Sequence, residues 1–336
     1  MAAGIDHYAI KRSDFMAPIS LLRDVASTAS LPLEECDVLH LHGINGAIKM
    51  ENLAELSAGR KTVWTLHDMN PFTSVCHYSL GCDGFTSGCR SCPAVRKGFT
   101  EAVGRHFDKK REAIRAIENL TVVSPSSWLA DQAIASEVFS DTPVVVQPNP
   151  INAAFFDDSI APSAAKPGCV LSVIAIAASL DDEVKNISFL VDAFTEAFGN
   201  RADVKLTLVG QGGASFSRAN IERYGRATAG EIRDLVSQSD VLVVPSRAEN
   251  APLVIPEAAA QGCEAFVAYV GGMPELVTTL GVGAVFTDER TLVGLLSAKA
   301  EEPAKKREQV RKKLRTQARA IFHPRAVASE YAKVYS

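Results

Sequence analysis

Two glutamates in the second half of the chain have a setting that suits chemistry on a bound ligand. Glu249 lies in a polar loop after the apolar segment 241–244, and Glu257 lies in the first turn of a predicted helix. Segments 241–244 and 265–270 favour buried parallel strands. A glycine pair at 271–272 would let the backbone approach a ligand. Both carboxylates are therefore expected at the carboxyl edge of a parallel sheet, where open α/β sheets bind ligands. Alternatively, they are ordinary surface acids of a strand-to-helix unit.

A histidine and an aspartate stand next to each other in the first half of the chain. His67 and Asp68 end the apolar segment 61–66, which favours a strand, so both are expected at its carboxyl end. An imidazole there could hydrogen-bond a sugar or help to orient an attacking hydroxyl. The carboxylate of Asp68 could deprotonate that hydroxyl or orient His67, and the sequence does not separate these roles. His42, which follows segment 36–41, is interpreted as structural.

Four cysteines occur within one glycine-rich stretch. They are Cys76, Cys82, Cys89 and Cys92, the last two in a C-x-x-C pattern. Four thiolates suit a closed tetrahedral zinc site, which would stabilise a long loop that lacks a hydrophobic core. Such a zinc would be structural, because four protein ligands leave no open coordination position. His77 is an alternative ligand, and two reversible disulfides or four free thiols are alternatives to the metal.

Length and composition indicate a soluble protein of two domains. The 336 residues are 47% hydrophobic, and the net charge of −4 gives no basic surface that would favour a nucleic-acid partner. No apolar run is long enough for a transmembrane helix, and residues 1–15 lack the apolar core of a secretory signal. We therefore expect a cytoplasmic protein whose seven cysteines are reduced, buried or metal-bound.

Strands that alternate with helices predict a parallel α/β architecture in both domains. The expected N-terminal domain covers residues 1–156 and carries the cysteine-rich loop 76–92. A linker at 157–167, rich in Asp, Ser, Ala and Pro, leads to a second domain at 168–320. Residues 301–336 predict a basic and then amphipathic helical tail with a break at Pro324. Its basic part is interpreted as a solvated helix face, with weak contact to a membrane surface as the alternative.

Two motifs resemble a known enzyme family. The run P-S-x-x-E-N-x-P…E-A…G, followed by G-G-x-P-E, lies in residues 245–277 and resembles the donor-site signature of the retaining GT-B glycosyltransferases of family 4. The W-T-L-H-D motif and the cysteines, in residues 64–93, resemble a subgroup from polysaccharide biosynthesis. The resemblance implies an α/β GT-B fold in which two Rossmann-like parallel-sheet domains face a cleft. It also implies that the final helix, 321–336, packs back on the N-terminal domain.

The chain departs from the family at its start. The family opens with a strand, a Gly-rich loop and a long helix, and this sequence shows no such opening. We therefore expect an incomplete N-terminal domain, with a protein partner or a membrane surface as a possible cover for it.

The resemblance also implies roles for individual residues. Glu249 would lie by the transferred sugar, Glu257 would hydrogen-bond the ribose of the nucleotide, and His67 would lie near the donor sugar. Lys185 matches the lysine that binds the donor diphosphate. The usual arginine is absent near residues 178–179, so Arg247 is the candidate replacement. The remaining donor-binding candidates are Gly210, Gly212, Asn250, Ala251, Pro252 and Leu253.

The expected function is transfer of a sugar from a nucleotide donor, with UDP or GDP as the nucleotide, to a hydroxyl of a glycan or a lipid-linked acceptor. Retention of anomeric configuration is implied by the family, and no catalytic metal is expected. The alternative is a non-catalytic sugar-nucleotide binder or partner subunit, because of the altered N-terminus and the absent arginine. A nucleotide-sugar epimerase shares the architecture, but it needs catalytic acids in the N-terminal half, where Asp68 is the clear candidate. A cytoplasmic location, with peripheral contact at the inner face of the membrane as an option, completes the prediction.

Overall fold

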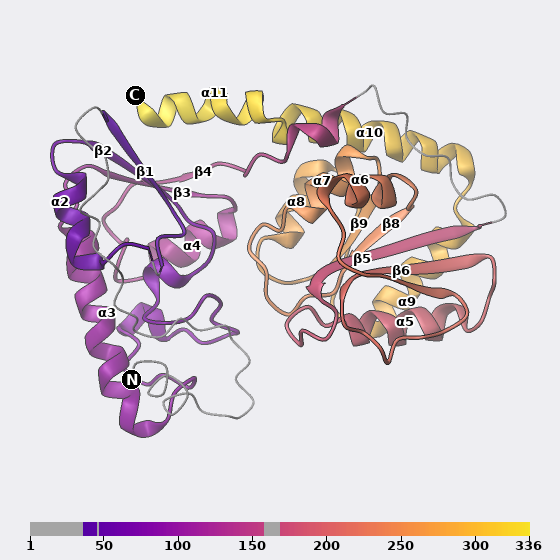
Figure 1. The fold of residues 1–336 in the computed structure, drawn as a ribbon, viewed down its shortest axis with the longest axis horizontal. Coiled ribbons are helices and arrows are strands. Elements are labelled where there is room, and N and C mark those ends of the chain that lie inside the picture. Colours follow the sequence, from indigo (N-terminus) through magenta and orange to yellow (C-terminus); the bar gives the residue numbers. More distant parts are fainter. Residues whose placement is uncertain (1–35, 46, 158–168) are drawn as a thin grey trace. The chain divides into compact units, whose positions relative to one another are not determined.

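The computed structural model describes residues 36–45, 47–157 and 169–336 (Figure 1). The chain divides into two compact units, one made of residues 1–147 and 330–336 and the other of residues 148–329. Each unit has its own parallel sheet, as the alternating strands and helices predict. The predicted linker at 157–167 lies outside the described residues except for Asp157.

The first unit contains a four-stranded sheet in the order β1-β2-β3-β4, and all three pairings are parallel. In this sheet His42, the last residue of β1, is in register with Thr65, the last residue of β2. The residues that follow β1 and β2 are therefore at the same edge. The strands are β1 (Val38–His42), β2 (Lys61–Thr65), β3 (Leu120–Ser124) and β4 (Val144–Val146).

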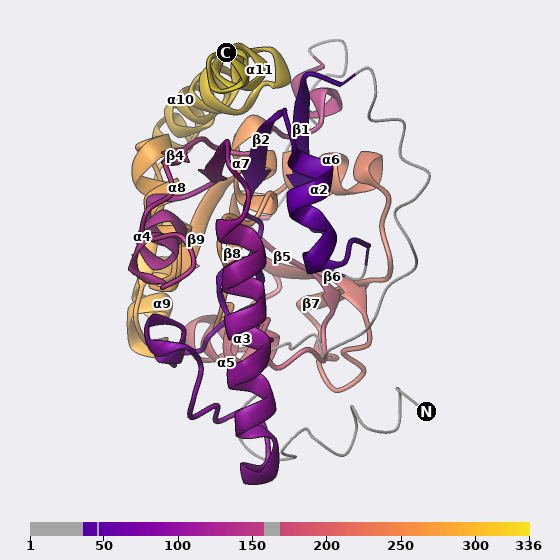
Figure 2. The same ribbon diagram turned by 90° about the vertical axis from the view of Figure 1, so that its left-hand side faces the viewer.

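Helices and one long loop complete the first unit. Helix α3 (Thr100–Arg115) lies beside the short α2 (Leu53–Ser57), as both views show (Figure 2). Helix α4 (Ser127–Ala135) is capped by Ser126, whose hydroxyl accepts from the N–H of Leu129. Four 3₁₀ turns precede α2 or lie in the region between β2 and α3: η1 (Met50–Asn52), η2 (Asn70–Phe72), η3 (Gly84–Ser87) and η4 (Lys97–Phe99).

The core of this unit is aromatic. Trp64 on β2 packs edge-on against Phe139, and Phe139 in turn contacts Phe72 of η2. Phe72, Phe107 of α3 and Phe139 are fully buried. Buried aromatic side chains contribute more apolar area per residue than aliphatic ones. They therefore give a small four-stranded sheet a continuous core and fix the position of the loop that starts at η2.

The second unit contains a six-stranded parallel sheet in the order β10-β9-β8-β5-β6-β7. From β5 the chain adds β6 and β7 on one side, and it then returns to add β8, β9 and β10 on the other. The order therefore reverses between β5 and β8, which makes this the topological switch point of the sheet. The strands are β5 (Leu171–Ser179), β6 (Val204–Gln211), β7 (Ile221–Tyr224), β8 (Val241–Val244), β9 (Glu264–Ala268) and β10 (Ala284–Phe286).

Helices cover both faces of this sheet (Figure 1). One apolar cluster joins the sheet to α5 (Ile187–Phe198) and α9 (Glu289–Glu301). The other joins it to α7 (Val254–Ala260), α8 (Met273–Leu280) and α10 (Ala304–Phe322), with α6 (Ala229–Ser237) beside α7. Strand β8 is buried along its whole length, as expected for a central strand of a parallel sheet.

Residues 148–156 belong to the second unit, although the predicted N-terminal domain extended to residue 156. The side chains of Phe155 and Phe156, in η5 (Ala153–Phe156), are buried in the core beside α7 and α10. Arg319 of α10 lies over the ring of Phe156 and donates to its carbonyl at 2.7 Å. The main chain after β4 therefore packs with the second unit before the predicted linker begins.

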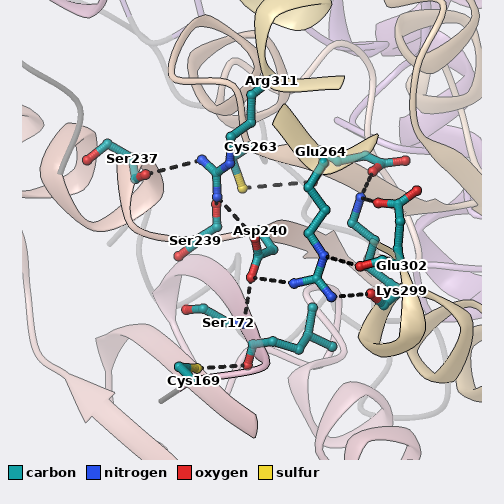
Figure 3. Close-up of polar contacts among 12 residues, drawn as sticks. Cys169, Ser172, Ser237, Ser239, Asp240, Cys263, Glu264, Lys299, Glu302 and Arg311 are labelled. Atoms are coloured by element: carbon teal, nitrogen blue, oxygen red, sulfur yellow. Dashed lines mark hydrogen bonds and ion pairs between the residues drawn. The ribbon is translucent and has the colours of Figure 1, made fainter. Parts of the chain in front are cut away.

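The basic helix α10 is bound to the sheet by its arginines and is not wholly solvated, so the interpretation as a solvated face is wrong for them. Figure 3 shows Arg311 bonded to Asp240 at 3.1 Å, and Arg307 lies 3.5 Å from the same carboxylate. Asp240 also accepts from the N–H of Ser172 at the start of β5. Further along α10, Arg315 donates to the carbonyl of Gln261. The Asp240 contacts lie where β5 and β8 begin, and Gln261 ends α7 just before β9, so all of them are at the edge opposite the carboxyl ends of these strands.

The helical tail breaks where the sequence predicts. Helix α10 ends at Phe322 and α11 (Pro324–Tyr335) begins after His323. Residues 330–336, the end of α11, group with the first unit. None of the helices in the described ranges is long and apolar enough to span a membrane.

Candidate active site

Glu249 and Lys185 form an ion pair across the switch point of the six-stranded sheet. Lys185 follows β5 and Glu249 follows β8, and Lys185 Nζ lies 2.6 Å from Glu249 Oε1. The hydroxyl of Ser246 donates to the same oxygen at 3.1 Å. Glu249 is only 6% exposed, so its charge depends on these two donors. Two residues that the sequence placed independently in the donor site are thus brought together at the position where α/β sheets bind ligands.

The local chain conformation explains why these two loops meet. A carboxylate oxygen of Asp182 accepts from the N–H of Val184 and forms the turn that carries Lys185. The N–H of Arg247 then donates to the carbonyl of Val184 at 2.8 Å. Asn186, with a left-handed φ of 55°, caps α5 and donates from its side chain to the carbonyl of Pro245 at 3.2 Å. The loops after β5 and β8 are therefore joined on both sides of Lys185, by one backbone bond and one bond from a side chain to the backbone.

Gly271 holds the Glu249 loop from the other side. Its φ is +57°, and a Cβ atom there would lie 1.7 Å from the carbonyl oxygen of Glu249. No residue with a side chain fits this position without displacing that loop. The sequence predicted that this glycine pair lets the backbone approach a ligand; in the structure, Gly271 lets it approach Glu249.

The first unit gathers histidines at the carboxyl edge of β1 and β2. His42 Nδ1 lies 2.9 Å from His67 Nε2, and the two rings are stacked. The His40 ring contacts the His42 ring at a tilt, with ring centroids 4.1 Å apart. Both His42 and His67 are solvent-exposed. Partial desolvation lowers the pKa of His67, while the carboxylate of Asp68 raises it.

Asp68 is bonded to His77 of the cysteine-rich loop. One carboxylate oxygen lies 2.5 Å from His77 Nδ1, and the other accepts from the N–H of Asn70 at 2.8 Å. The hydrogen-bond partner that the structure gives Asp68 is therefore His77, and His67 instead pairs with His42.

The four cysteines of the loop line one small cavity of about 20 Å³, room for about one water-sized atom. All four are free thiols, and burial raises the pKa of Cys76 to about 12 and that of Cys89 to about 11. Among the residues that the structure describes, no three His, Cys, Asp or Glu side chains are arranged to hold a metal ion. The loop thus collects the four sulfur atoms without forming a ligand set, and a zinc site stays a prediction.

A buried lysine anchors this loop. Lys110 of α3 is 1% exposed, and its ammonium donates to the carbonyls of Asn70, Thr73 and Ser74 at 2.7, 2.9 and 3.0 Å. Burial lowers its pKa to about 8. It therefore remains an ammonium at neutral pH, with three donors for three acceptors.

Comparisons with known proteins locate the chain among glycosyltransferases. Residues 172–300 match the family model described as glycosyl transferases group 1. The protein WcaC of Escherichia coli (strain K12), named for glycosyl transfer in colanic acid biosynthesis, is 24% identical over 292 residues, 81% of this chain and 68% of its own. The family match places residues 172–300, most of the second unit, in the group 1 glycosyltransferases of family 4. This is a retaining family with the GT-B fold, so the resemblance seen in the two sequence motifs is confirmed.

Solved structures agree with the family fold. Sucrose-phosphate synthase from Thermosynechococcus elongatus has a TM-score of 0.60 and 17% identity, with 89% of this chain and 73% of that chain covered. HepE from Anabaena, solved with UDP-glucose, has a TM-score of 0.57 and 17% identity, with 89% and 78% covered. At 17% identity, the likeness to these structures establishes the fold of this chain and does not assign roles to its residues.

Other predicted donor-binding glycines of this glycosyltransferase have internal packing roles. Gly210, with φ of +150°, would place a Cβ 2.1 Å from the carbonyl oxygen of Ala177 on β5. A Cβ on Gly212 would lie 2.0 Å from a carboxylate oxygen of Asp181, whose other oxygen accepts from the N–H of Gly213. Both glycines follow or end β6, and both make room for the end of β5. Their proposed contact with a nucleotide stays a prediction.

The remaining candidates surround the start of α7. Burial raises the pKa of Glu257, which is half-buried in the first turn of this helix. Asn250 is buried, and Arg247 exposes its side chain. The loop residues Ala251, Pro252 and Leu253 directly precede the helix, which begins at Val254. These residues lie after β8, close in sequence to Glu249 of the ion pair. Their contact with a donor stays a prediction.

Sequence reasoning missed several residues of this site. Ser246, which bonds Glu249, stands in the P-S-x-x-E run without an assigned role, and a hydroxyl three residues before a buried acid was the available signal. His40 was not considered. The H-x-H pattern at His40 and His42 was its signal, because residues two apart on a strand share a face. The partnership of Asp68 with His77 had no local signal, since it depends on how the loop returns.

Proposed function

We propose that this protein transfers a hexosyl group from a nucleotide sugar to a hydroxyl of a glycan or a lipid-linked acceptor, with retention of configuration. The observation that carries the proposal is the buried Glu249, held by Lys185 and Ser246 at the switch point of the sheet. This arrangement lies within the residues that match the family model. Family membership supports the reaction, and the ion pair supports the site in the second unit.

UDP is the nucleotide that the comparisons favour. HepE was solved with UDP-glucose, and the pneumococcal O-GlcNAc transferase GtfA, 14% identical with a TM-score of 0.55, was solved with UDP and GlcNAc. We propose a UDP-hexose as the donor on this basis. The relation to WcaC supports an acceptor from polysaccharide biosynthesis.

In the proposed reaction, Lys185 stabilises the leaving diphosphate. Negative charge builds on the diphosphate as the glycosidic bond breaks, and a preorganised cation lowers the energy of that state. Lys185 has one-third of its side chain exposed, so its ammonium can be shared between Glu249 and a bound phosphate. Glu249 then keeps the cation oriented and accepts hydrogen bonds from the sugar. His67 is proposed, from the family resemblance, to contact the donor sugar.

One feature favours a non-catalytic sugar-nucleotide binder as the second candidate. Residues 178–186 contain a single cation, Lys185, together with Asp181, Asp182 and Glu183. The structure already engages that cation with Glu249. A donor diphosphate would therefore find little uncompensated positive charge in this segment, which predicts weak donor binding or slow turnover.

The experiment is release of UDP or GDP from a panel of UDP- and GDP-hexoses, with and without oligosaccharide acceptors. We expect release from a UDP-hexose, and we expect Glu249→Gln to reduce it by about 10²-fold or more. The matched control is Glu196→Gln, an exposed position on α5, which should leave the rate unchanged. Thermal shift with UDP measures binding separately, because about 2.7 kcal/mol of stabilisation is expected at 100 times the Kd. Binding of UDP without turnover of any donor would favour the second candidate and refute the transferase.

A further inference from the structure

A continuous set of polar contacts links the C-terminal helix to His67 within the first unit. The hydroxyl of Tyr335 lies 2.8 Å from His40 Nδ1, and the hydroxyl of Tyr331 lies 2.9 Å from Thr65 Oγ1. His40 Nε2 lies 2.8 Å from the same threonine oxygen. The His40 ring then contacts the tilted ring of His42, and His42 Nδ1 lies 2.9 Å from His67 Nε2. Each step is within hydrogen-bond or ring-contact distance.

Strand geometry explains why these side chains meet. His40 and His42 are two residues apart on β1 and share one face, whereas Leu41 between them is buried in the aromatic core on the other. Thr65 of β2 is in register with His42, and it lies under Tyr331, which is 8% exposed. The two tyrosines, one turn apart on α11, thus reach the face of the sheet opposite the core.

The hydrogen bond between the two histidines fixes their protons in a complementary way. Two neutral imidazoles share one proton in the bond between His42 Nδ1 and His67 Nε2. If His42 donates, His67 carries its own proton on Nδ1; if His67 donates, its Nδ1 is an acceptor. The hydrogen-bond partner of one ring nitrogen therefore determines whether the other nitrogen is protonated, as for histidines in general. A bond at this position controls whether His67 offers a donor or a base.

The remaining contacts hold His42 in place. Contact with the tilted ring of His40 restrains the His42 ring, and His40 is itself held at both nitrogens by Tyr335 and Thr65. Neutral imidazole needs one donor and one acceptor as partners, and two hydroxyl groups can satisfy both needs. Desolvation and repulsion from His42 and His67 lower the pKa of His40 to about 4, so His40 is neutral at pH 7.

We propose that His42, His40 and the two tyrosines of α11 are positioning residues that set the ring orientation and tautomer of His67. Through Tyr331 and Tyr335, the end of α11 thereby helps to orient His67 in the first unit. The proposal rests on the proposed function only in giving His67 a role in transfer. The geometry of the cluster itself is independent of whether transfer occurs.

The experiment uses the full-length protein labelled with ¹⁵N and ¹³C in its histidines. The tautomer and the pKa of His67 are read from ring-nitrogen and Cε1 chemical shifts, with the His67 signals assigned through His67→Gln. Wild type should show one dominant tautomer. His42→Leu should convert His67 to a mixture of tautomers, because the hydrogen bond to His67 Nε2 is lost. The other titratable groups around the three rings are Asp68, Tyr331 and Tyr335, and all are retained in this variant.

Conservative variants separate positioning from simple structural support. His42→Asn keeps a polar group near the Nδ1 position and should retain one dominant tautomer of His67. Tyr335→Phe should change the His67 signals in the same direction as His42→Leu but less. Tyr224→Phe removes a hydroxyl that bonds Glu231 in the second unit and should leave those signals unchanged.

Activity adds a second readout. If the protein transfers sugar, His42→Leu should change kcat and its pH profile with little change in donor KM, and His42→Asn should restore most of the rate. Because the spectra need no turnover, failure of the proposed function is distinguishable from failure of this inference. If folded His42→Leu and Tyr335→Phe proteins both give the wild-type tautomer of His67, the inference is overturned.

Discussion

The ion pair between Lys185 and Glu249 permits a quantitative test of the proposed donor site. The perturbation is a double-mutant cycle of Lys185→Met, Glu249→Gln and the double variant. Lys185→Met removes the cation and leaves a carboxylate whose side chain is 8% exposed, with Ser246 as its other described donor. Removing one partner of a fully buried pair costs about 3–5 kcal/mol. Lys185 is 32% exposed, and solvent screening reduces the expected cost to about 1–2 kcal/mol.

The double variant should recover most of that loss, because methionine and glutamine leave no unpaired charge. We expect a coupling energy of about 1–2 kcal/mol from the cycle. The matched control is the pair of Lys205 and Glu222, at 2.9 Å with both side chains at least one-third exposed. Lys205→Met should cost less than about 1 kcal/mol and show little coupling with Glu222→Gln.

Urea unfolding followed by circular dichroism measures these free energies. Both tryptophans, Trp64 and Trp128, lie in the first unit, so fluorescence reports that unit separately. UDP titration of the same variants tests the role of the cation, since a hydrogen bond to a charged group is worth about 1.5–3 kcal/mol, or roughly 10- to 100-fold in affinity. The reasoning is refuted if the two single changes are additive and if Lys185→Met binds UDP as tightly as the wild type.

Three further predictions follow from the first unit. Lys110→Met should lower the free energy of unfolding by several kcal/mol, at about 1–3 kcal/mol for each of three carbonyls left without a donor. Lys109→Met on the same helix should have little effect. Equal unfolding midpoints for the two variants would contradict the role of Lys110 in holding the loop. If the cysteine loop binds zinc, protein purified without chelator should contain about one equivalent by elemental analysis and lose it in the Cys89→Ser/Cys92→Ser variant; four titratable thiols without metal would exclude the site. Burial is the main reason why the pKa values of His40 and His106 are lowered to about 4. Between pH 6.5 and 4 the unfolded chain therefore binds more protons at these two histidines than the folded chain does. Stability should therefore be retained above pH 6.5 and fall as the pH drops toward 4, and His40→Asn should flatten this dependence in urea titrations; an unchanged slope would remove His40 as a cause.

The sequence predicted the central strands β8 and β2 well and missed the edge strand β7. Apolar runs mark β8 and β2, whose residues are almost all buried, and their predicted bounds differ from the observed ones by at most one residue. Strand β7 (Ile221–Tyr224) was missed because three of its four residues are exposed. Burial on both faces produces the apolar signal, and an edge strand carries little of it.

The same limit explains which site contacts could be predicted. Lys185 and Glu249 each stand in a motif, and the parallel sheet then brings the ends of their strands together. Partners fixed by a long loop have no such frame. Asp68 and His77 meet because the loop after β2 returns on itself, so the adjacent His67 was the only partner for Asp68 that local order could suggest.

The glycine pair at 271–272 links these two lessons. Its place in the sequence suggested contact with a ligand, and the structure shows Gly271 against the backbone of Glu249 instead. The two motif halves, the glutamate loop after β8 and the glycines after β9, are therefore one packed unit. Because a side chain at residue 271 would meet the Glu249 carbonyl at 1.7 Å, the glycine fixes where the loop of Glu249 can lie. The position of the carboxylate then depends on a residue that carries no charge and need not touch the substrate.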